Sequence, residues 1–580
     1  MAGSRGWIMV AALTTVTACT SGTSSTATTL EIADAPPPTT STSPGAPVTS
    51  PDTSSTTLPQ VVATEFAGRE LISDAGSHFS AAGSCSNCHT NMTDATGSDI
   101  SIDSTWRSTM MANAARDPYW QATVRAEIEK APDLRDVIED KCSTCHMPMA
   151  RTTGAFSGEG GAVLDAGYLD STNELHGLAM DGVSCTVCHQ IQEGNLGSEE
   201  SFSGGFSIDA DLPQGQRIVY GPIGASEQGA QIMTNVSGFA PIQSPHLQES
   251  TVCATCHTLY TPYVDANGEV LGLFPEQTTF LELQASAVNS SCQDCHMPEA
   301  DGEAFVSNFA SEPRSNVSRH HFVGGNDYMM SIMSVFGEEL GLTASSDHVA
   351  ATRDRIQTQL ARDSMSLDLG ELSWDGEMVT ATAVVGNPTG HKVPTGFPSR
   401  RVWLHATLTA GDGSIVFESG AWQANGSIAG NDNDHDPAGF EQHHDVITDP
   451  EQVQIYEAIM ANSDGAVTTT LLRGSEYAKD NRLLPQSFDK TSVSPDIGVY
   501  GAALADDGFT GGADSVTYVI DTSGFTGPFT FGVEVLYQSI GFRWAANLRD
   551  ARGAEVERFM GYYDAVPNIP VVMATQTVEY

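Results

Sequence analysis

Basic residues are scarce in this sequence. Its 580 residues include 26 Lys and Arg against 72 Asp and Glu, so the formal net charge is −46 at pH 7. Contacts to phosphate groups need Lys and Arg, so this balance excludes a general nucleic-acid binder and docking on anionic lipid through a basic patch. The acidic charge instead favours solubility, cationic partners or a salty medium. A hydrophobic content of 40% with 17% charged residues is typical of a folded chain.

Long apolar runs and several catalytic motifs are also absent. No stretch reaches the roughly 20 apolar residues that a membrane-spanning helix needs. The sequence contains no phosphate-binding loop with Lys, no His-Glu-x-x-His and no nucleophile elbow. These absences argue against nucleotide-binding, zinc-protease and serine-hydrolase chemistry.

The N-terminus is typical of an exported lipoprotein. Residues 1–19 contain one Arg and a short apolar run, and then Val16-Thr17-Ala18-Cys19, which resembles the bacterial lipobox. We expect cleavage before Cys19 and lipid attachment to it; the alternative is a plain signal peptide that is discarded with Cys19. Residues 20–62 are rich in Ser, Thr and Pro and are predicted to be a disordered linker. The predicted location is therefore the membrane surface, facing the periplasm or the cell exterior.

The other ten cysteines form five Cys-x-x-Cys pairs, and a His follows each pair directly. The motifs are Cys85-Ser-Asn-Cys88-His89, Cys142-Ser-Thr-Cys145-His146, Cys185-Thr-Val-Cys188-His189, Cys253-Ala-Thr-Cys256-His257 and Cys292-Gln-Asp-Cys295-His296. Cys-x-x-Cys-His is the attachment signal of c-type haem, in which two thiols bind one porphyrin and the adjacent His is the proximal iron ligand. Zinc sites, redox pairs and disulfides also use Cys-x-x-Cys, but none requires a His after every pair.

The sequence thus predicts five covalent c-type haems. The short intervals between motifs leave little chain per haem, so we expect neighbouring haems to lie close together. The distal iron ligand is harder to predict, because bis-His ligation, His/Met ligation and an empty position are all known and have different consequences for potential and chemistry. The distal candidates are His176, His246, His320 and His391, with His78 and Met111 as alternatives for the fifth iron.

The region of about residues 65–330 resembles the exported multihaem cytochromes c related to the tetrahaem cytochrome of nitrification and to octahaem hydroxylamine oxidoreductase and tetrathionate reductase. The resemblance rests on the five motifs, their two Cys-His-Met-Pro extensions, His176 ahead of the third motif, and the runs 106–118 and 320–326. In related proteins a His often stands at the position of Met111. Nitrite-reducing pentahaem enzymes typically carry a Cys-x-x-Cys-Lys motif, which is absent here, so the resemblance implies electron transfer as the default.

The pattern changes after residue 345. Residues 346–365 predict a connecting helix, and the alternating runs 379–385, 402–408 and 529–537 predict a β-sandwich-like domain over 366–580. The acidic loop of that domain places Asp432, Asp434 and Asp436 at alternate positions. Oxygen ligands at this spacing suit Ca²⁺, and a solvated acidic loop explains them equally well.

Together these features predict an α+β multidomain protein, with a mainly helical and irregular pentahaem cytochrome c domain over 63–345. The expected function is electron transfer by a lipid-anchored redox relay. The sequence favours an electron carrier over an enzyme. Two alternatives stay open. One is a multihaem reductase of a small nitrogen or sulfur oxyanion at one pentacoordinate haem, and the other is a self-assembling subunit of a polymeric or outer-membrane electron conduit.

Overall fold

The computed structural model describes residues 61–213 and 215–580. These residues belong to one compact unit. The predicted signal peptide, the lipidation site Cys19 and all but the end of the predicted linker lie outside the described residues. Within the described part, no helix combines the length and the apolar character needed to cross a membrane.

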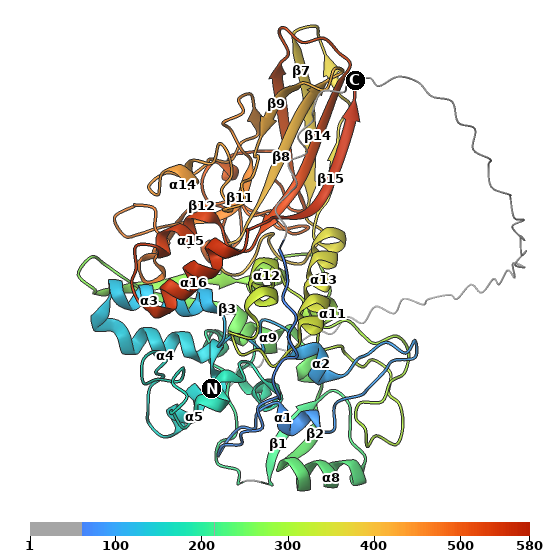
Figure 1. The fold of residues 1–580 in the computed structure, drawn as a ribbon, viewed down its shortest axis with the longest axis vertical. Helices are drawn as coiled ribbons and strands as arrows, with labels where there is room; N and C mark the ends of the chain where they lie inside the picture. Colours follow the sequence, from blue (N-terminus) through green and yellow to red (C-terminus); the bar gives the residue numbers. More distant parts are fainter. Residues whose placement is uncertain (1–60, 214) are drawn as a thin grey trace, which may run out of the picture. The chain divides into compact units, whose positions relative to one another are not determined.

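The region before residue 345 consists of short helices, loops and two small strand pairs (Figure 1). Its helices are α1 (Gly83–Ser86), α2 (Ile102–Trp106), α3 (Pro118–Lys130), α4 (Arg135–His146), α5 (Pro148–Phe156), α6 (His176–Met180), α7 (Cys185–Cys188), α8 (Glu227–Ser237), α9 (Ser250–His257), α10 (Thr279–Gln284), α11 (Cys292–His296) and α12 (Asp327–Phe336). The parallel pair is β1 (Arg217–Gly221) with β2 (Phe239–Gln243), and the antiparallel pair is β3 (Thr258–Val264) with β4 (Val270–Thr278).

The Cys-x-x-Cys-His motifs coincide with helical turns. Helices α4, α9 and α11 each end at the His of a motif, while α1 and α7 hold cysteines of the first and third motifs. Residues three apart on a helix lie on the same face, so the two thiols of each pair share one side of the turn. This local geometry follows directly from the motif spacing.

Helix α13 (Ser346–Asp363) leads into the C-terminal region. Ser345 caps it, and Val349, Ile356 and Leu360 form its buried face. Two sheets follow. One has the order β10-β13-β7-β5 with β6 beside β7, and the other has the order β12-β11-β8-β14-β15 with β9 beside β8.

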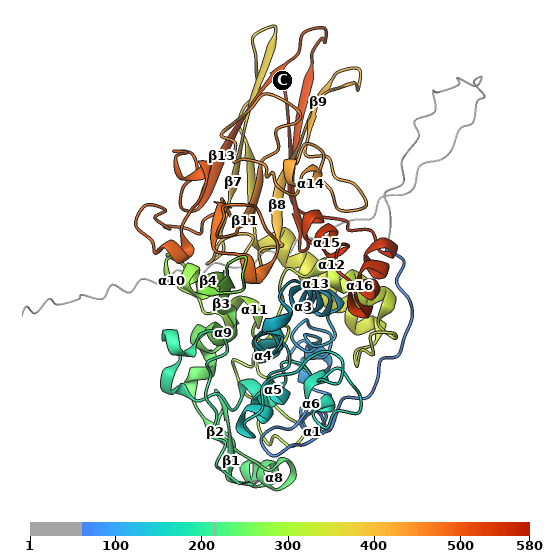
Figure 2. The ribbon, with the colours of Figure 1, turned by 90° about the vertical axis from the view of Figure 1, so that its left-hand side faces the viewer.

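Figure 2 shows β7 and β13 in one layer and β8 and β9 in the other. The strands are β5 (Ser366–Leu369), β6 (Ser373–Trp374), β7 (Met378–Gly386), β8 (Arg401–Ala410), β9 (Ile415–Ser419), β10 (Val446–Ile447), β11 (Ile455–Ala461), β12 (Glu476–Asp480), β13 (Ala513–Asp521), β14 (Phe529–Gln538) and β15 (Val571–Glu579). The three alternating runs of the sequence lie in β7, β8 and β14, where every second side chain faces the core. The protein is therefore a mixed α+β protein.

The two regions share one hydrophobic core. The largest buried cluster contains Tyr119 and Ala122 of α3, Met330 of α12, and residues of β7, β8, β13 and β14. The C-terminal helix α16 (Ala554–Ala565) packs against α3 and follows α15 (Phe542–Leu548). Because the core is continuous, the loop between β7 and β8 has a defined position against the motif-bearing region.

Candidate haem sites

Seven buried or half-buried histidines have the same hydrogen-bond pattern. The Nδ1 atom of each contacts a backbone carbonyl oxygen, and no described residue hydrogen-bonds to its Nε2 atom. Four belong to the motifs: His89 with Val306 at 2.7 Å, His146 with Ala114 at 3.0 Å, His189 with Tyr220 at 2.6 Å, and His296 with Val323. Three are predicted distal ligands: His176 with Tyr168 at 2.9 Å, His320 with Ser318 at 3.2 Å, and His391 with Lys392 at 2.9 Å.

A carbonyl acceptor at Nδ1 has a specific chemical consequence. It holds the ring proton on Nδ1, so Nε2 carries the lone pair that a metal ion requires. Metal-binding histidines are usually oriented in this way. Burial also lowers the pKa of His320 to about 3 and that of His146 to about 4, which keeps both rings neutral.

Two of the predicted distal histidines lie opposite a motif histidine. The ring centres of His189 and His320 are 6.4 Å apart with an angle of 22° between the ring planes. The ring centres of His296 and His391 are also 6.4 Å apart, with an angle of 16°. Two metal–nitrogen bonds of about 2 Å, with about 1.2 Å from each Nε2 to its ring centre, span roughly 6.4 Å. Each pair therefore fits one iron between two imidazoles.

The other three motif histidines are not paired in this way. Among residues 61–213 and 215–580, no second histidine ring is stacked at this separation from His89, His146 or His257. The ring of His146 stacks instead on Trp120, with centres 4.4 Å apart. His176 has a free Nε2 but faces no motif histidine at the 6.4 Å separation.

None of the ten cysteines of the motifs forms a disulfide bond. Thiols of different motifs lie close together in three places: the first motif with the third, the second with the fourth, and the fourth with the fifth. These contacts join Cys85 to Cys185, Cys145 to Cys256, and Cys253 to Cys292. Cys188 of the third motif lies near the fourth, since burial and then the charge of Cys256 raise its pKa to about 12. The attachment points of neighbouring motifs are thus adjacent in space.

The remaining distal candidates have other environments. Both ring nitrogens of buried His246 are engaged, Nδ1 with Ser244 Oγ at 2.7 Å and Nε2 with the carbonyl oxygen of Ile191 at 2.9 Å. In this arrangement His246 has no nitrogen left for iron, and we do not propose it as a ligand. His78 bonds to Ser77 through Nδ1 at 2.8 Å and keeps Nε2 free. Half-buried Met111 lies beside the third motif, where its carbonyl oxygen accepts the N–H of Val183.

Replacing His246 therefore tests whether a histidine with both ring nitrogens hydrogen-bonded is not an iron ligand. His246→Gln keeps hydrogen-bonding groups at this position, so we expect five bound haems and an unchanged low-spin signal in electron paramagnetic resonance. Loss of one low-spin signal would show instead that His246 turns toward an iron when haem is bound.

The predicted calcium site is not formed. Asp432 and Asp434 lie in the short helix α14 (Asp432–His435), so alternate side chains do not share one face as they would in an extended loop. Both oxygens of Asp434 bind the guanidinium of Arg401, at 3.0 and 3.1 Å, in a buried ion pair. Asp436 accepts the backbone N–H of Ala438. The three carboxylates do not converge on one point, and Asp434 instead joins α14 to β8.

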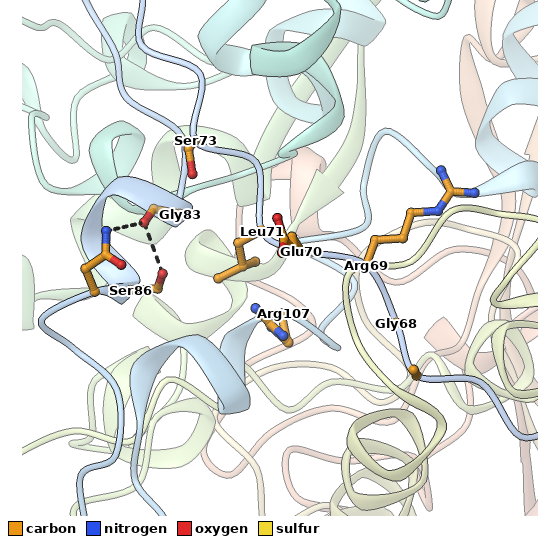
Figure 3. Close-up of a pocket in the computed structure, with 10 residues that line it drawn as sticks. Gly68, Arg69, Glu70, Leu71, Ser73, Gly83, Ser86 and Arg107 are labelled. Atoms are coloured by element: carbon orange, nitrogen blue, oxygen red, sulfur yellow. Dashed lines mark hydrogen bonds between the residues drawn. The ribbon is translucent and has the colours of Figure 1, made fainter.

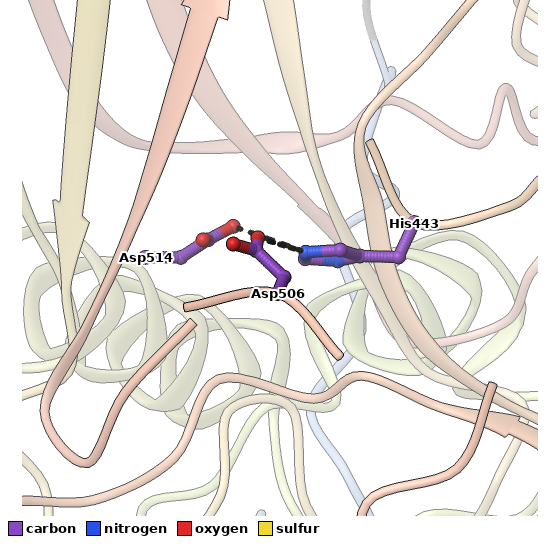
Figure 4. A group of neighbouring side chains, drawn as sticks. All are labelled: His443, Asp506 and Asp514. Carbon is purple, nitrogen blue, oxygen red and sulfur yellow. Dashed lines mark hydrogen bonds and ion pairs between the residues drawn. The ribbon is translucent and has the colours of Figure 1, made fainter. Parts of the chain in front are cut away.

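One group of potential metal ligands was not visible in the sequence, because its members lie in different segments. His443, Asp506 and Asp514 come together between the two sheets, and their ligand atoms lie within 4.8 Å of one another (Figure 4). His443 Nε2 is 2.9 Å from Asp506 and 4.0 Å from Asp514.

The hydrogen bonds at the other nitrogen argue against metal binding. Side-chain amides of Gln454 and Asn481 donate to Nδ1 of His443, at 2.8 and 3.0 Å. Each amide oxygen accepts a backbone N–H, which fixes the orientation of the amide. The lone pair of His443 is therefore on Nδ1 and its proton on Nε2, where it is donated to Asp506. This cluster is a structural link between loops.

An open cavity of about 460 Å³ lies beside the first motif (Figure 3). Ser86 and Asn87 of that motif line it, together with Arg69 and Arg107. Arg107 Nε is buried and has no hydrogen-bond partner among the described residues. A half-buried guanidinium with an unpartnered Nε next to a haem-attachment motif suits an anionic group such as a haem propionate.

Comparison with known proteins gives one similar structure. No family model matches the chain, and no curated protein matches it. Among solved structures, a penta-heme cytochrome c552 from Thermochromatium tepidum is 16% identical, with a TM-score of 0.48. The similarity covers 87% of this chain and 100% of that chain.

Proposed function

We propose that this protein is a pentahaem cytochrome c that transfers electrons outside the cytoplasm. The observation that carries the proposal is the placement of His320 and His391 opposite the histidines of the third and fifth motifs, each with Nδ1 anchored and Nε2 free. Two such pairs would give bis-His ligation, which favours low potentials. When bound, haem iron supplies a reversible one-electron couple.

The contacts between motifs support a relay. The thiol contacts order the attachment sites from the first motif to the third, the fourth and the fifth, with the second motif beside the fourth. Cys295 is the one exposed thiol among the ten, so the fifth site reaches the surface. Asp294 and Asp363 lie near it, and their negative charges favour a redox partner with a basic docking surface.

We also propose that a lipid on Cys19 anchors the protein to a membrane facing the periplasm or the cell exterior. The lipobox-like sequence before Cys19 and the Ser/Thr/Pro-rich segment after it support this. In the folded part, the residues act by holding cofactors: cysteines attach them, histidines bind the irons, and burial excludes water.

Mass and spin state test the function together. The purified ferric protein is expected to have the mass of the processed chain plus five haems, with at least two low-spin bis-His signals in electron paramagnetic resonance. A colourless protein with the mass of the bare chain, produced in a host that matures c-type cytochromes, would reject the proposal.

A reductase is the second candidate, and one observation favours it. His89, His146 and His257 lack an opposing histidine among the described residues, and His176 can serve only one of these three sites. Two irons would then bind another ligand or keep an open position, where a small nitrogen or sulfur oxyanion could react. One high-spin ferric signal together with reduction of such an oxyanion would favour the reductase. A native size larger than one chain would instead favour a subunit of an electron conduit.

A further inference from the structure

Arg400 has no carboxylate partner among the described residues, although the chain contains 72 acidic residues against 26 basic ones. It lies between the His391 loop and β8. Its Nη1 donates to the carbonyl oxygen of Thr395 at 2.7 Å, and its Nη2 donates to Asn326 Oδ1 at 3.2 Å. Both acceptors are neutral, so the positive charge of this half-buried side chain is left without an ion pair.

The guanidinium lies close to the fourth and fifth motifs. Thr395, whose carbonyl oxygen accepts one of its N–H groups, contacts Thr279 Oγ1 at 3.0 Å, and the neighbouring Thr278 pairs with Thr258, which directly follows His257. Asn326, the other acceptor, comes three residues after Val323, whose carbonyl oxygen contacts Nδ1 of His296. His296 and His391 form the pair described above, and His257 belongs to the fourth motif. One cation from the C-terminal region thus lies beside two predicted haem sites.

Two segments hold Arg400 in position. Gly396 has a φ of 82°, and a Cβ atom there would lie 3.0 Å from Nη1 of Arg400, so the guanidinium packs directly against this glycine. Asn326 ends the run 320–326 that carries His320. A guanidinium has five N–H groups, and two are used by Thr395 and Asn326, so three are available to a further acceptor.

We propose that Arg400 binds propionate groups of the haems attached at the fourth and fifth motifs. The inference rests on the proposed haem binding. A planar guanidinium forms two parallel hydrogen bonds with a carboxylate, and haem propionates are carboxylates that need cationic or polar partners when they are partly buried. Arg400 would then join the C-terminal region to two cofactors, in addition to the axial ligand His391.

Redox titration of Arg400→Gln tests the proposal. Loss of a positive charge beside the propionates disfavours the reduced state, so we expect the midpoint potentials of one or two haems to decrease while the other potentials stay constant. Haem content by mass should remain five. Arg549→Gln is the matched control, because Arg549 pairs with exposed Asp564 on the surface, and its potentials should equal those of the wild type.

Arg400→Lys keeps the charge but loses the planar fork. We expect its potentials to lie between those of the wild type and Arg400→Gln, with a shifted propionate-bending band in the resonance Raman spectrum. Unchanged potentials in Arg400→Gln, or an unchanged band in Arg400→Lys, would overturn the proposed role of Arg400. If these variants still bound five haems, the proposed function would be unaffected. A wild-type protein without haem would instead overturn the proposed function.

Discussion

His391→Ala is expected to convert one haem from the low-spin to the high-spin ferric state. His391 is 6.4 Å from His296 between ring centres, and its Nε2 is free. Alanine offers no ligand in its place, so the iron at the fifth motif would lose the strong field of a second imidazole. Electron paramagnetic resonance should show one low-spin signal replaced by a high-spin signal, and the absorption spectrum should show the same change in one of five haems.

The control for this prediction comes from the same region. His405 of β8 hydrogen-bonds to Glu418 and Glu534, at 3.0 Å each, and has no free nitrogen. His405→Gln should therefore keep the wild-type spectrum. If His391→Ala also keeps every low-spin signal, the pairing of His391 with His296 is incorrect.

Asp480→Asn is expected to cause a large loss of stability. Asp480 binds Lys392 at 2.8 Å and Arg482 at 2.7 Å, and Arg482 also binds Glu282 of α10 at 3.0 Å. This buried network holds the His391 loop against α10, and Glu282 also accepts the backbone N–H of Lys392. Removing one carboxylate leaves Lys392 without its only ionic partner among the described residues, and breaking a buried pair in this way costs about 3–5 kcal/mol of unfolding free energy.

The same substitution should change the response to acid. Burial alone would raise the pKa of Asp480, but the charges of Arg482 and Lys392 lower it to about 2, from an ordinary value of 3.8. A carboxyl group with a lowered pKa in the folded state contributes stability above its unfolded pKa, and this contribution is lost as the pH falls through the folded pKa. Between pH 4 and pH 2 the wild type should therefore lose stability more steeply than Asp480→Asn.

Urea unfolding at pH 7 and at lower pH measures both effects. Asp464→Asn is the control, because Asp464 is 73% exposed and its pair with Arg473 is long, at 3.8 Å. Its unfolding free energy should equal that of the wild type. Equal stability of Asp480→Asn and the wild type at pH 7 would show that the network does not hold the loop.

Local patterns carried much of the information about the sites. The five motifs, and the settings of His176, His320 and His391, were visible in the sequence because each depends on neighbouring residues. Spacing alone was a poorer guide for His246, which precedes a motif by the same interval as His78. His246 makes hydrogen bonds through both nitrogens, one of them to Ile191, and a contact over 55 residues cannot be read from spacing.

The acidic loop shows a different limit. The alternation of Asp432, Asp434 and Asp436 suggested converging ligands only if the loop was extended. A helical turn separates the side chains, and Arg401, distant in sequence, takes both oxygens of Asp434. The cluster at His443 is the reverse case, since its members are spread over three segments and have no local signature.

The sequence by itself determined the attachment motifs, the acidic character and the alternating strands, because these depend on residue type and on intervals of a few residues. Only the tertiary structure decided that His189 lies opposite His320 and that His296 lies opposite His391. The partners in these pairs are separated by long stretches of chain, and the meeting of His296 with His391 also depends on the packing of a continuous core between the two regions. Periodicity describes which face a side chain occupies, but it does not determine which distant side chain lies opposite.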